Sequence, residues 1–197
     1  MRKVVVSQFV TVDGVMEDPG GSEKSERGGW AFQFERGPDG DRFKLDEVME
    51  SDALLLGRVT YEGFAEAWPS RTGEFADKFN NMPKYVVSTT LRDPEWNNST
   101  VIGGDVANEV AKLKRESGGV ILVNGSARLV ATLMEHDLVD EYRLMVFPVL
   151  LGAGKRLFED AGPPAALRLT QARPVGSDGV LVLVYERAGA EADAAAA

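Results

Sequence analysis

Short apolar runs alternate with amphipathic stretches along the first two thirds of the chain. The apolar runs lie at residues 3–10, 52–57, 84–88, 100–102 and 120–123, and they are rich in Val, Leu and Ile. Apolar positions with helical spacing occur at 39–51, from about residue 59, through Phe75 and Phe79, from Asp105 to the glycines at 118–119, and at 126–135. Short runs that are apolar throughout are typical of parallel strands covered by helices on both faces. The pattern therefore predicts an α/β fold with three layers and a mostly parallel central sheet.

The pattern changes after Leu138. Three expected strands, 138–148, 167–173 and 180–187, follow one another with no helical pattern between them. Parallel strands need a long crossover connection, whereas antiparallel strands can be joined by short turns. We therefore expect the sheet to finish with antiparallel strands, within a single domain that spans residues 1–187. Residues 188–197 form an alanine-rich tail that we expect to be disordered.

Composition and charge exclude several classes of function. The chain has 197 residues, a formal net charge of −9, no cysteine and one histidine, His136. The negative charge and the lack of Lys and Arg clusters argue against a nucleic-acid-binding surface. A chain without cysteine and with one histidine cannot build a thiolate or multi-histidine metal site, so no metal site is expected. We expect His136 to lie on the surface at the end of a helix rather than in a Ser-His-Asp triad.

The sequence shows no signal peptide and no apolar stretch long enough to span a membrane, which predicts a cytoplasmic protein without a membrane partner. Residues 17–29 are polar and rich in glycine. A loop of this length is either a solvated linker or a lid over a binding site, and both interpretations stay open.

Glycine and hydroxyl-bearing residues follow the ends of three expected strands. The three segments are Gly57-Arg58-Val59-Thr60, Ser88-Thr89-Thr90 and Asn124-Gly125-Ser126. A helix that starts at a glycine presents unpaired backbone N–H groups, which bind phosphate, and Arg58 adds a cation. Each segment alone also fits an ordinary capped turn, with Arg58 in solvent. Because the carboxyl ends of parallel strands share one edge of a sheet, three such junctions predict a common site for a nucleotide-type ligand.

A further glycine pair, Gly152 and Gly154, follows the expected strand that ends at Pro148. These glycines would let the backbone approach a flat ring, with Leu151 and Phe158 as its walls. The alternative is an ordinary turn into a short helix with a buried Phe158.

The order of these segments resembles that in a known family. The matching segments are Val12-Asp13-Gly14, 56–62 (Leu-Gly-Arg-Val-Thr-Tyr-Glu), 87–91 (Val-Ser-Thr-Thr-Leu), 123–127 (Val-Asn-Gly-Ser-Ala), 138–141 and 148–154. Together they are similar to the reductase domain of the bifunctional riboflavin-biosynthesis deaminase-reductase, within the dihydrofolate-reductase-like superfamily. The resemblance spans residues from about Val4 to Arg187. It implies a dihydrofolate-reductase-like fold in which NADPH lies along the carboxyl edge of the sheet.

The resemblance also implies roles for individual residues. The residues implied to bind the cofactor are Gly57, Arg58 and Thr60 in the phosphate region, Ser88 and Thr89 near the adenosine 2′-phosphate, Gly125 and Ser126 at the pyrophosphate, and Gly152 and Gly154 near the nicotinamide. Asp13 and Trp30 would border the substrate cleft. Family members often have arginine where Thr89 stands, so a contact to the 2′-phosphate could come from Arg92 instead. The zinc-dependent deaminase half is missing from this sequence, so a role in riboflavin synthesis does not follow.

One carboxylate is a candidate for catalysis. Dihydrofolate reductases place a carboxylate four residues before a helical Phe-Lys pair, and Asp39 stands four residues before Phe43-Lys44. Asp39 is therefore a candidate proton relay, with helix capping as the favoured alternative.

Taken together, these features predict an NADPH-dependent reductase that transfers hydride to a small heteroaromatic or carbonyl substrate, of pterin or pyrimidine type. The cofactor would supply the chemistry, which suits a chain without cysteine and with one histidine. The main alternative is a non-catalytic nucleotide-binding or regulatory protein on the same fold, and a structural dimer module with a vestigial cleft is a third interpretation. The apolar strand segment from Leu144 to Phe147 and its antiparallel neighbours could pair with a second copy of the chain, and we therefore also expect a homodimer.

Overall fold

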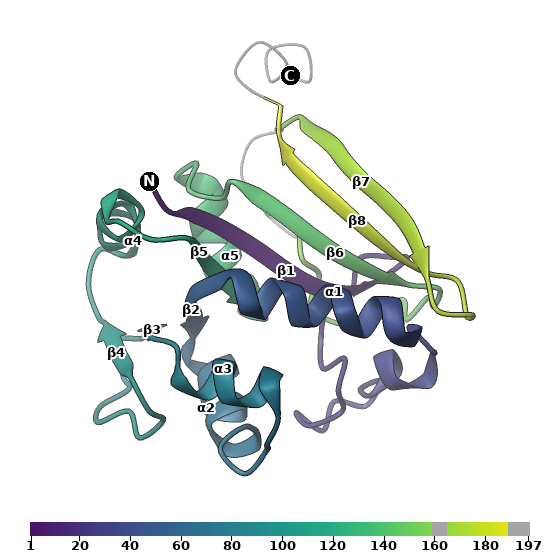
Figure 1. Ribbon diagram of the computed structural model, residues 1–197, viewed down its shortest axis with the longest axis horizontal. Coiled ribbons are helices and arrows are strands. Elements are labelled where there is room, and N and C mark those ends of the chain that lie inside the picture. Colours follow the sequence, from purple (N-terminus) through teal and green to yellow (C-terminus); the bar gives the residue numbers. More distant parts are fainter. Residues whose placement is uncertain (159–164, 189–197) are drawn as a thin grey trace.

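An eight-stranded mixed sheet forms the centre of the computed structural model, which describes residues 1–158 and 165–188 (Figure 1). The strands are β1 (Lys3–Thr11), β2 (Ser51–Gly57), β3 (Lys84–Val87), β4 (Ser99–Ile102), β5 (Val120–Asn124), β6 (Glu141–Phe147), β7 (Leu167–Val175) and β8 (Val180–Arg187). The helices are the 3₁₀ turn η1 (Trp30–Gln33), α1 (Gly37–Glu50), α2 (Arg58–Ala67), α3 (Glu74–Asn81), α4 (Val106–Arg115) and α5 (Ala127–Glu135). Except for Ala188, the tail that we expect to be disordered lies outside the described residues.

The sheet has the order β4-β3-β2-β5-β1-β6-β8-β7. All neighbouring pairs from β4 to β6 are parallel, and the pairs β6–β8 and β7–β8 are antiparallel. The predicted antiparallel finish is therefore confirmed for β7 and β8. In contrast, β6 also extends the parallel part through β1, because α5 provides the long crossover that carries the chain from β5 to the far side of β1.

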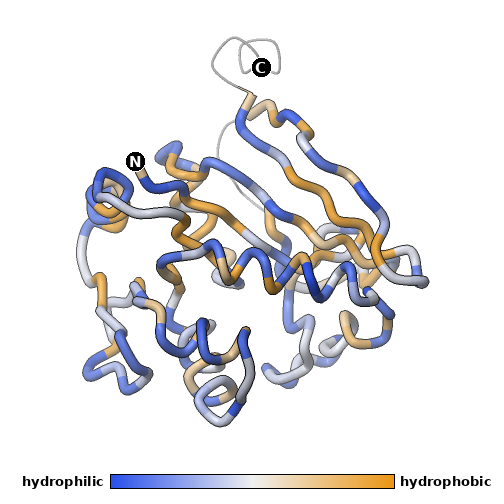
Figure 2. The backbone as a smooth tube through the Cα atoms, in the orientation of Figure 1, coloured by the Kyte–Doolittle hydropathy of each residue, from blue (hydrophilic) through white to orange (hydrophobic). Residues whose placement is uncertain are grey.

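Helices cover both faces of the sheet, which gives the three predicted layers. Val4 and Val6 of β1 pack in one core with α4 and α5, whereas Val5 packs on the opposite face with residues of α1, α2 and α3. A third core lies around Phe147 and the valines of β8. Figure 2 shows that the apolar residues follow the strands of the sheet. The fold is α/β, as the alternation of apolar runs and helical spacing predicts.

Several predicted helix ends are observed. Asp105 begins α4, and its carboxylate accepts the backbone N–H of Asn108 at 3.1 Å. His136 is an exposed residue at the end of α5, as expected. No helix among the described residues is long and apolar enough to cross a membrane.

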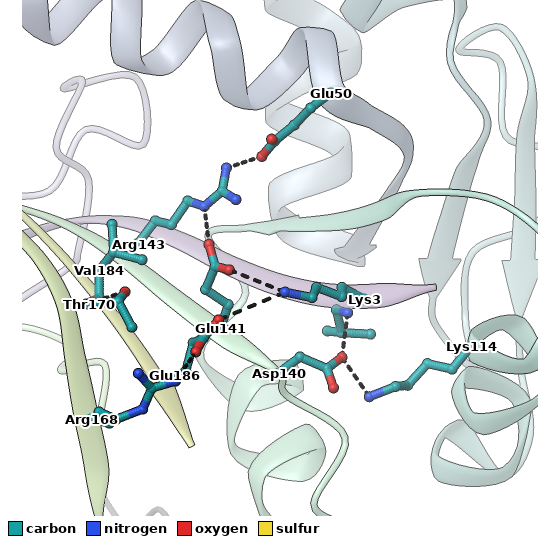
Figure 3. A network of polar contacts seen from close by, with 11 residues as sticks. Lys3, Glu50, Lys114, Asp140, Glu141, Arg143, Arg168, Thr170, Val184 and Glu186 are labelled. Carbon is teal, nitrogen blue, oxygen red and sulfur yellow. Dashed lines mark hydrogen bonds and ion pairs between the residues drawn. The ribbon is translucent and has the colours of Figure 1, made fainter. Parts of the chain in front are cut away.

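A network of charged residues ties α1 to the strands β1, β6, β8 and β7 (Figure 3). Arg143 of β6 forms ion pairs with Glu50 at the end of α1 and with Glu141 on its own strand. Lys3 of β1 lies 3.9 Å from Glu141 and 3.8 Å from Glu186 of β8, which also pairs with Arg168 of β7. Nearby, Asp140 accepts the backbone N–H of Val4 at 2.7 Å and pairs with Lys114 at 2.6 Å. These contacts give the segment at 138–141 a structural role at the start of β1 and β6.

The strand that was expected to form a dimer interface lies inside the sheet. Leu144–Phe147 of β6 is paired on one side with β1 and on the other with β8. Its backbone groups are therefore used within the chain, and it cannot add a strand from a second copy. The edges of the sheet are β4 and β7. One of these edges, β7, belongs to the antiparallel neighbours of this strand, and the homodimer stays a prediction.

Candidate active site

A cleft of about 1350 Å³ runs along the carboxyl edge of the sheet. Its walls come from β1, from α1, α2, α3 and α5, from the segment 16–23, and from the turns that follow β2, β3 and β5. The three predicted strand-end segments therefore meet in one cavity. The residues Gly57, Arg58, Thr60, Ser88, Thr89, Gly125 and Ser126 all line it.

The turns after β2 and β5 are joined by direct hydrogen bonds. The backbone N–H of Gly57 donates to the Ser126 hydroxyl at 2.8 Å, and that hydroxyl donates to the Thr60 hydroxyl at 3.0 Å. Gly57 and Ser126 are the residues immediately before α2 and α5. Gly57 has no side chain, and the Ser126 hydroxyl does not cap its own helix. Two helix N-termini therefore lie side by side in the cleft. Their aligned backbone dipoles favour a bound anion.

The turn after β5 has an uncommon backbone conformation. Gly125 and Ser126 have φ values of 59° and 63°, in the left-handed region. A Cβ atom on Gly125 would lie 2.6 Å from Oγ1 of Thr60, so a side chain at this position would collide with α2. Only glycine allows α2 and this turn to approach so closely.

Gln8 holds the same turn from β1 and is a contributor that the sequence analysis missed. Its side-chain amide donates to the carbonyl oxygen of Gly125 at 2.8 Å and accepts the backbone N–H of Gly125 at 3.1 Å. The N–H of Gly125 is therefore already paired. We therefore expect the backbone N–H groups that bind an anion to lie in the first turns of the two helices and not at Gly125. A lone Gln within an apolar run was the signal in the sequence.

The turn after β3 is organised mainly by its own hydroxyl. Ser88 is buried, and its Oγ accepts the backbone N–H groups of Thr90 at 3.1 Å and Leu91 at 2.9 Å. This is the turn-capping role given above as the alternative for Ser88. Thr89 is exposed in the cleft wall, and Arg92 is exposed but is not part of the lining.

Charged side chains of both signs line the cleft. Six lining residues are Lys or Arg and five are Asp or Glu, in a chain whose net charge is −9. Arg58 pairs with Glu62 at 2.8 Å on the rim, with 44% of its side chain exposed. The cleft is therefore less negative than the rest of the surface, which suits an anionic ligand.

The residues assigned to the nicotinamide end and to one side of the substrate cleft lie outside the lining. The Asp13 carboxylate accepts the N–H groups of Gly152 at 2.7 Å and Leu151 at 3.3 Å, and the hydroxyl of Thr11 at 2.5 Å. These hydrogen bonds, led by that from Thr11, lower the pKa of Asp13 to about 2. Asp13 thus anchors the 151–152 turn, and the cleft is lined beside it by Met16, Glu17 and Lys155.

The second glycine of that turn is needed for packing. A Cβ atom on Gly154 would lie 2.8 Å from a methyl carbon of Val15. Phe158 is 44% exposed and meets the ring of Tyr142 edge-on, so it is neither a cleft wall nor buried. Residues 155–158 form no helix. Both interpretations given for Phe158 are therefore wrong.

Trp30 is a core residue and does not border the cleft. Its side chain is 1% exposed, its indole N–H donates to the carbonyl oxygen of Glu17 at 2.9 Å, and it packs edge-on against Phe147. The burial of Trp30 brings Phe32, two residues later, to the cleft instead. The spacing of aromatic residues alone could not distinguish these two.

Asp39 is exposed in the first turn of α1 and is not among the residues that line the cleft. The residue that precedes the helix is Arg36, so Asp39 is not the capping residue either. The structure therefore does not bring Asp39 to a position from which it could relay a proton to a ligand in this cleft.

The glycine-rich segment 17–29 is folded around Asp18 at the mouth of the cleft. The Asp18 carboxylate is 2% exposed and accepts the backbone N–H groups of Glu23 and Ser25, each at 3.0 Å. Residues 16–20, 22 and 23 line the cleft. This position agrees with the lid interpretation rather than with a linker remote from any site.

Two groups of lining residues were missed in the sequence. One is an aromatic wall formed by Phe64, Trp68, Phe75 and Phe79, in which Trp68 and Phe75 stack at 5.0 Å and Arg71 covers the Trp68 ring at 4.5 Å. The other is a polar pair from β1 and α1, Ser7 and Lys44, which contacts the buried Glu47. Predicting either group from the sequence would have required knowing which face of each helix packs against the sheet.

Comparison with known proteins places this architecture in a family. The model of the RibD C-terminal domain matches residues 2–181. The uncharacterized protein YyaP of Bacillus subtilis is 30% identical over 189 residues, which cover 93% of this chain and 94% of YyaP. Among solved structures, a candidate riboflavin biosynthesis protein of Shewanella sp. PV-4 has a TM-score of 0.75 at 20% identity, covering 95% of this chain and 99% of that one.

Dihydrofolate reductase from Enterococcus faecalis, in a complex with NADP(H), has a TM-score of 0.58 at 13% identity and covers 95% of this chain and 97% of its own. At this identity the likeness shows the fold alone, which is dihydrofolate-reductase-like. Because the family model spans nearly the whole described structure, this chain belongs to the RibD C-terminal domain family.

Proposed function

We propose that this protein is an NADPH-dependent reductase that transfers hydride to a small heteroaromatic or carbonyl substrate, of pterin or pyrimidine type. Membership of the RibD C-terminal domain family supports a reductase-type function. The similar dihydrofolate reductase structure contains NADP(H), which supports the choice of cofactor.

The observation that carries the proposal is the pair of helix N-termini joined by Ser126. The first turns of α2 and α5 open into the same cleft, and no N-cap side chain accepts a backbone N–H of either first turn. A diphosphate bound there would meet two sets of backbone N–H groups and the positive ends of two helix dipoles. The lack of space at Gly125 agrees with this arrangement, since it keeps the two helix starts close together.

The rest of the cleft suits a flat substrate beside the cofactor. When bound, NADPH would supply the hydride, and the protein would bind, orient and shield the reacting groups. Phe64, Trp68 and Phe75 offer an aromatic wall, and the segment around Asp18 stands where it would limit access of water. Arg58 and Thr89 also line the cleft, where they would meet the phosphate groups of the cofactor.

A titration of the purified protein with NADPH, followed by nicotinamide fluorescence, tests the proposal directly. We expect saturable binding of NADPH, and oxidation of NADPH when a panel of pterins, aminopyrimidines and small carbonyl compounds is added. If neither NADPH nor NADH binds, the proposal is wrong. Binding without oxidation on any compound of the panel would favour a nucleotide-binding regulatory protein instead.

A further inference from the structure

We propose that Lys44, held by Glu47 and Ser7, donates the proton that accompanies hydride transfer. The inference rests on the proposed reductase function. Reduction of a C=N or C=O bond adds a hydride to carbon and a proton to the heteroatom, so the site needs a proton donor as well as the cofactor. Asp39 cannot serve from its exposed position outside the cleft lining.

The three side chains form a compact cluster between β1 and α1. The Lys44 ammonium lies 2.5 Å from a carboxylate oxygen of Glu47 and donates to the Ser7 hydroxyl at 2.7 Å, while Ser7 donates to Glu47 at 2.9 Å. The Lys44 and Glu47 side chains are only 15% and 1% exposed. Ser7 and Lys44 line the cleft, whereas Glu47 lies behind them. Lys44 is thus the charged end of the cluster that faces a ligand.

An ammonium group has three N–H donors, and two of those of Lys44 are used by Ser7 and Glu47. Within residues 1–158 and 165–188, the third has no hydrogen-bond acceptor, and the ammonium lies 5.3 Å from the centre of the Phe9 ring. A substrate heteroatom in the cleft could accept it. Because Ser7 and Glu47 hold the ammonium, the Lys44 side chain has little conformational freedom. A proton donor that must meet a reacting atom has to be positioned in this way.

The ion pair is difficult to explain by stability alone. Removing two charges from water costs several kcal/mol, and apolar side chains of similar volume often stabilise a core as well or better. α1 already packs on the sheet through Val48, which is 1% exposed. A buried charge pair that opens onto a cleft is therefore a candidate for function.

The cluster also lies beside the proposed cofactor site. Ser7 is the register partner of Asn124 in the neighbouring strand, and the Asn124 amide donates to the carbonyl oxygen of Ser7 at 2.9 Å. Adjacent strands lie about 4.8 Å apart. Lys44 is therefore held close to the turn after β5, at the boundary between the phosphate side of the cleft and the α1 wall.

The other titratable groups of the described lining are less suited to this role. Glu23 and Glu74 are exposed, and Asp41 is exposed and paired with Arg36 at 2.7 Å. The Asp18 carboxylate is occupied by two backbone N–H groups of the 17–29 segment. Glu17 is paired with Lys155 at 3.1 Å, and 62% of the Lys155 side chain is exposed. The arginines of the lining stay protonated and do not act as acids.

The proposed step is balanced as follows. The substrate carbon receives hydride from NADPH, which becomes NADP⁺, and the π-electron pair of the C=N or C=O bond moves to the heteroatom. The heteroatom takes a proton from the Lys44 ammonium. Lys44 then regains a proton from solvent through the open side of the cleft.

The test uses the full chain with the double substitution Lys44→Met/Glu47→Gln, which removes both charges and so leaves no buried carboxylate unpaired. The single substitution Glu47→Gln keeps the ammonium and tests positioning. Lys112→Met is the control, because Lys112 forms an i,i+3 ion pair with Glu109 on the exposed face of α4, in the reverse sequence order. Each protein is titrated with NADPH and then assayed for NADPH oxidation on the panel described above, with kcat and KM determined separately.

We expect all variants to bind NADPH like the wild type. The double variant should lose about 10²- to 10³-fold in kcat, because the proton donor is gone while the cofactor still binds. Glu47→Gln should lose less, and Lys112→Met should be unchanged. If the double variant keeps kcat within about 3-fold of the wild type, the inference is wrong and the reductase proposal stands. If the wild type binds NADPH but oxidises it with no compound of the panel, both are overturned.

Discussion

The Ser126 hydroxyl accepts the backbone N–H of Gly57 at 2.8 Å and so joins the start of α5 to the start of α2. The same hydroxyl donates to Thr60 at 3.0 Å. One side chain therefore sets the distance between the two helix N-termini on which the proposed cofactor site depends. The resemblance implies a contact of Ser126 with the pyrophosphate, whereas the hydroxyl of Ser126 is already used within the protein.

Substitution of this hydroxyl should affect both stability and binding. Ser126→Ala leaves the N–H of Gly57 without its partner, and we expect a loss of about 1–2 kcal/mol in the free energy of unfolding. NADPH binding should weaken by about 10-fold as the helix starts separate. Urea denaturation and fluorescence titration measure the two effects. Ser117→Ala, at an exposed position, is the control, and equal behaviour of the two variants would contradict the prediction.

Gly125 should tolerate no side chain. In Gly125→Ala, the new Cβ would lie 2.6 Å from Thr60 at a backbone φ of 59°, so the turn or α2 must move. We expect NADPH affinity to fall by at least about 10-fold. Adding the substitution Thr60→Ala should restore part of the lost NADPH affinity, because this substitution removes the collision but not the backbone strain. Gly104→Ala, which meets no heavy atom within 4 Å, should bind NADPH normally.

Gln8 should be important for the stability of the same turn. Gln8→Leu keeps the approximate size but leaves the N–H and carbonyl groups of Gly125 unpaired in a part-buried position. We expect a loss of about 2 kcal/mol in unfolding free energy, measured by urea denaturation. Gln33→Leu, at an exposed position of η1, is the control. A Gln8→Leu protein as stable as the wild type would show that the two hydrogen bonds contribute little.

Asp13 should make the protein sensitive to acid. Its folded-state pKa of about 2 lies below the ordinary value of 3.8, so the unfolded state binds more protons between these two values. The contribution of Asp13 to stability is therefore present above about pH 4 and is lost as the pH falls toward 2. Asp13→Asn should be less stable than the wild type at neutral pH, and the difference should shrink in acid. Urea midpoints across this range test it, and a constant difference would argue against the role of the carboxylate.

Much of the fold follows from local patterns. The apolar runs became strands and the amphipathic stretches became helices, because burial on two faces and burial on one face leave different periodicities in a sequence. The parallel connection of β6 to β1 was not expected, since it depends on where α5 delivers the chain and not on the residues of β6.

The residues of the candidate site could likewise be predicted from the sequence only in part. The sequence alone determined that Gly57, Thr89 and Gly125 lie at strand ends, and parallel topology then brings such residues to one edge. Only the tertiary structure decided that Asp13, Trp30, Asp39, Gly152 and Gly154 lie outside the lining of the cleft. It also revealed Gln8 and Lys44, whose partners are far away in the chain. The physical reason is that residue spacing gives the face of an element to which a side chain belongs, whereas its contacts depend on which other element packs against that face.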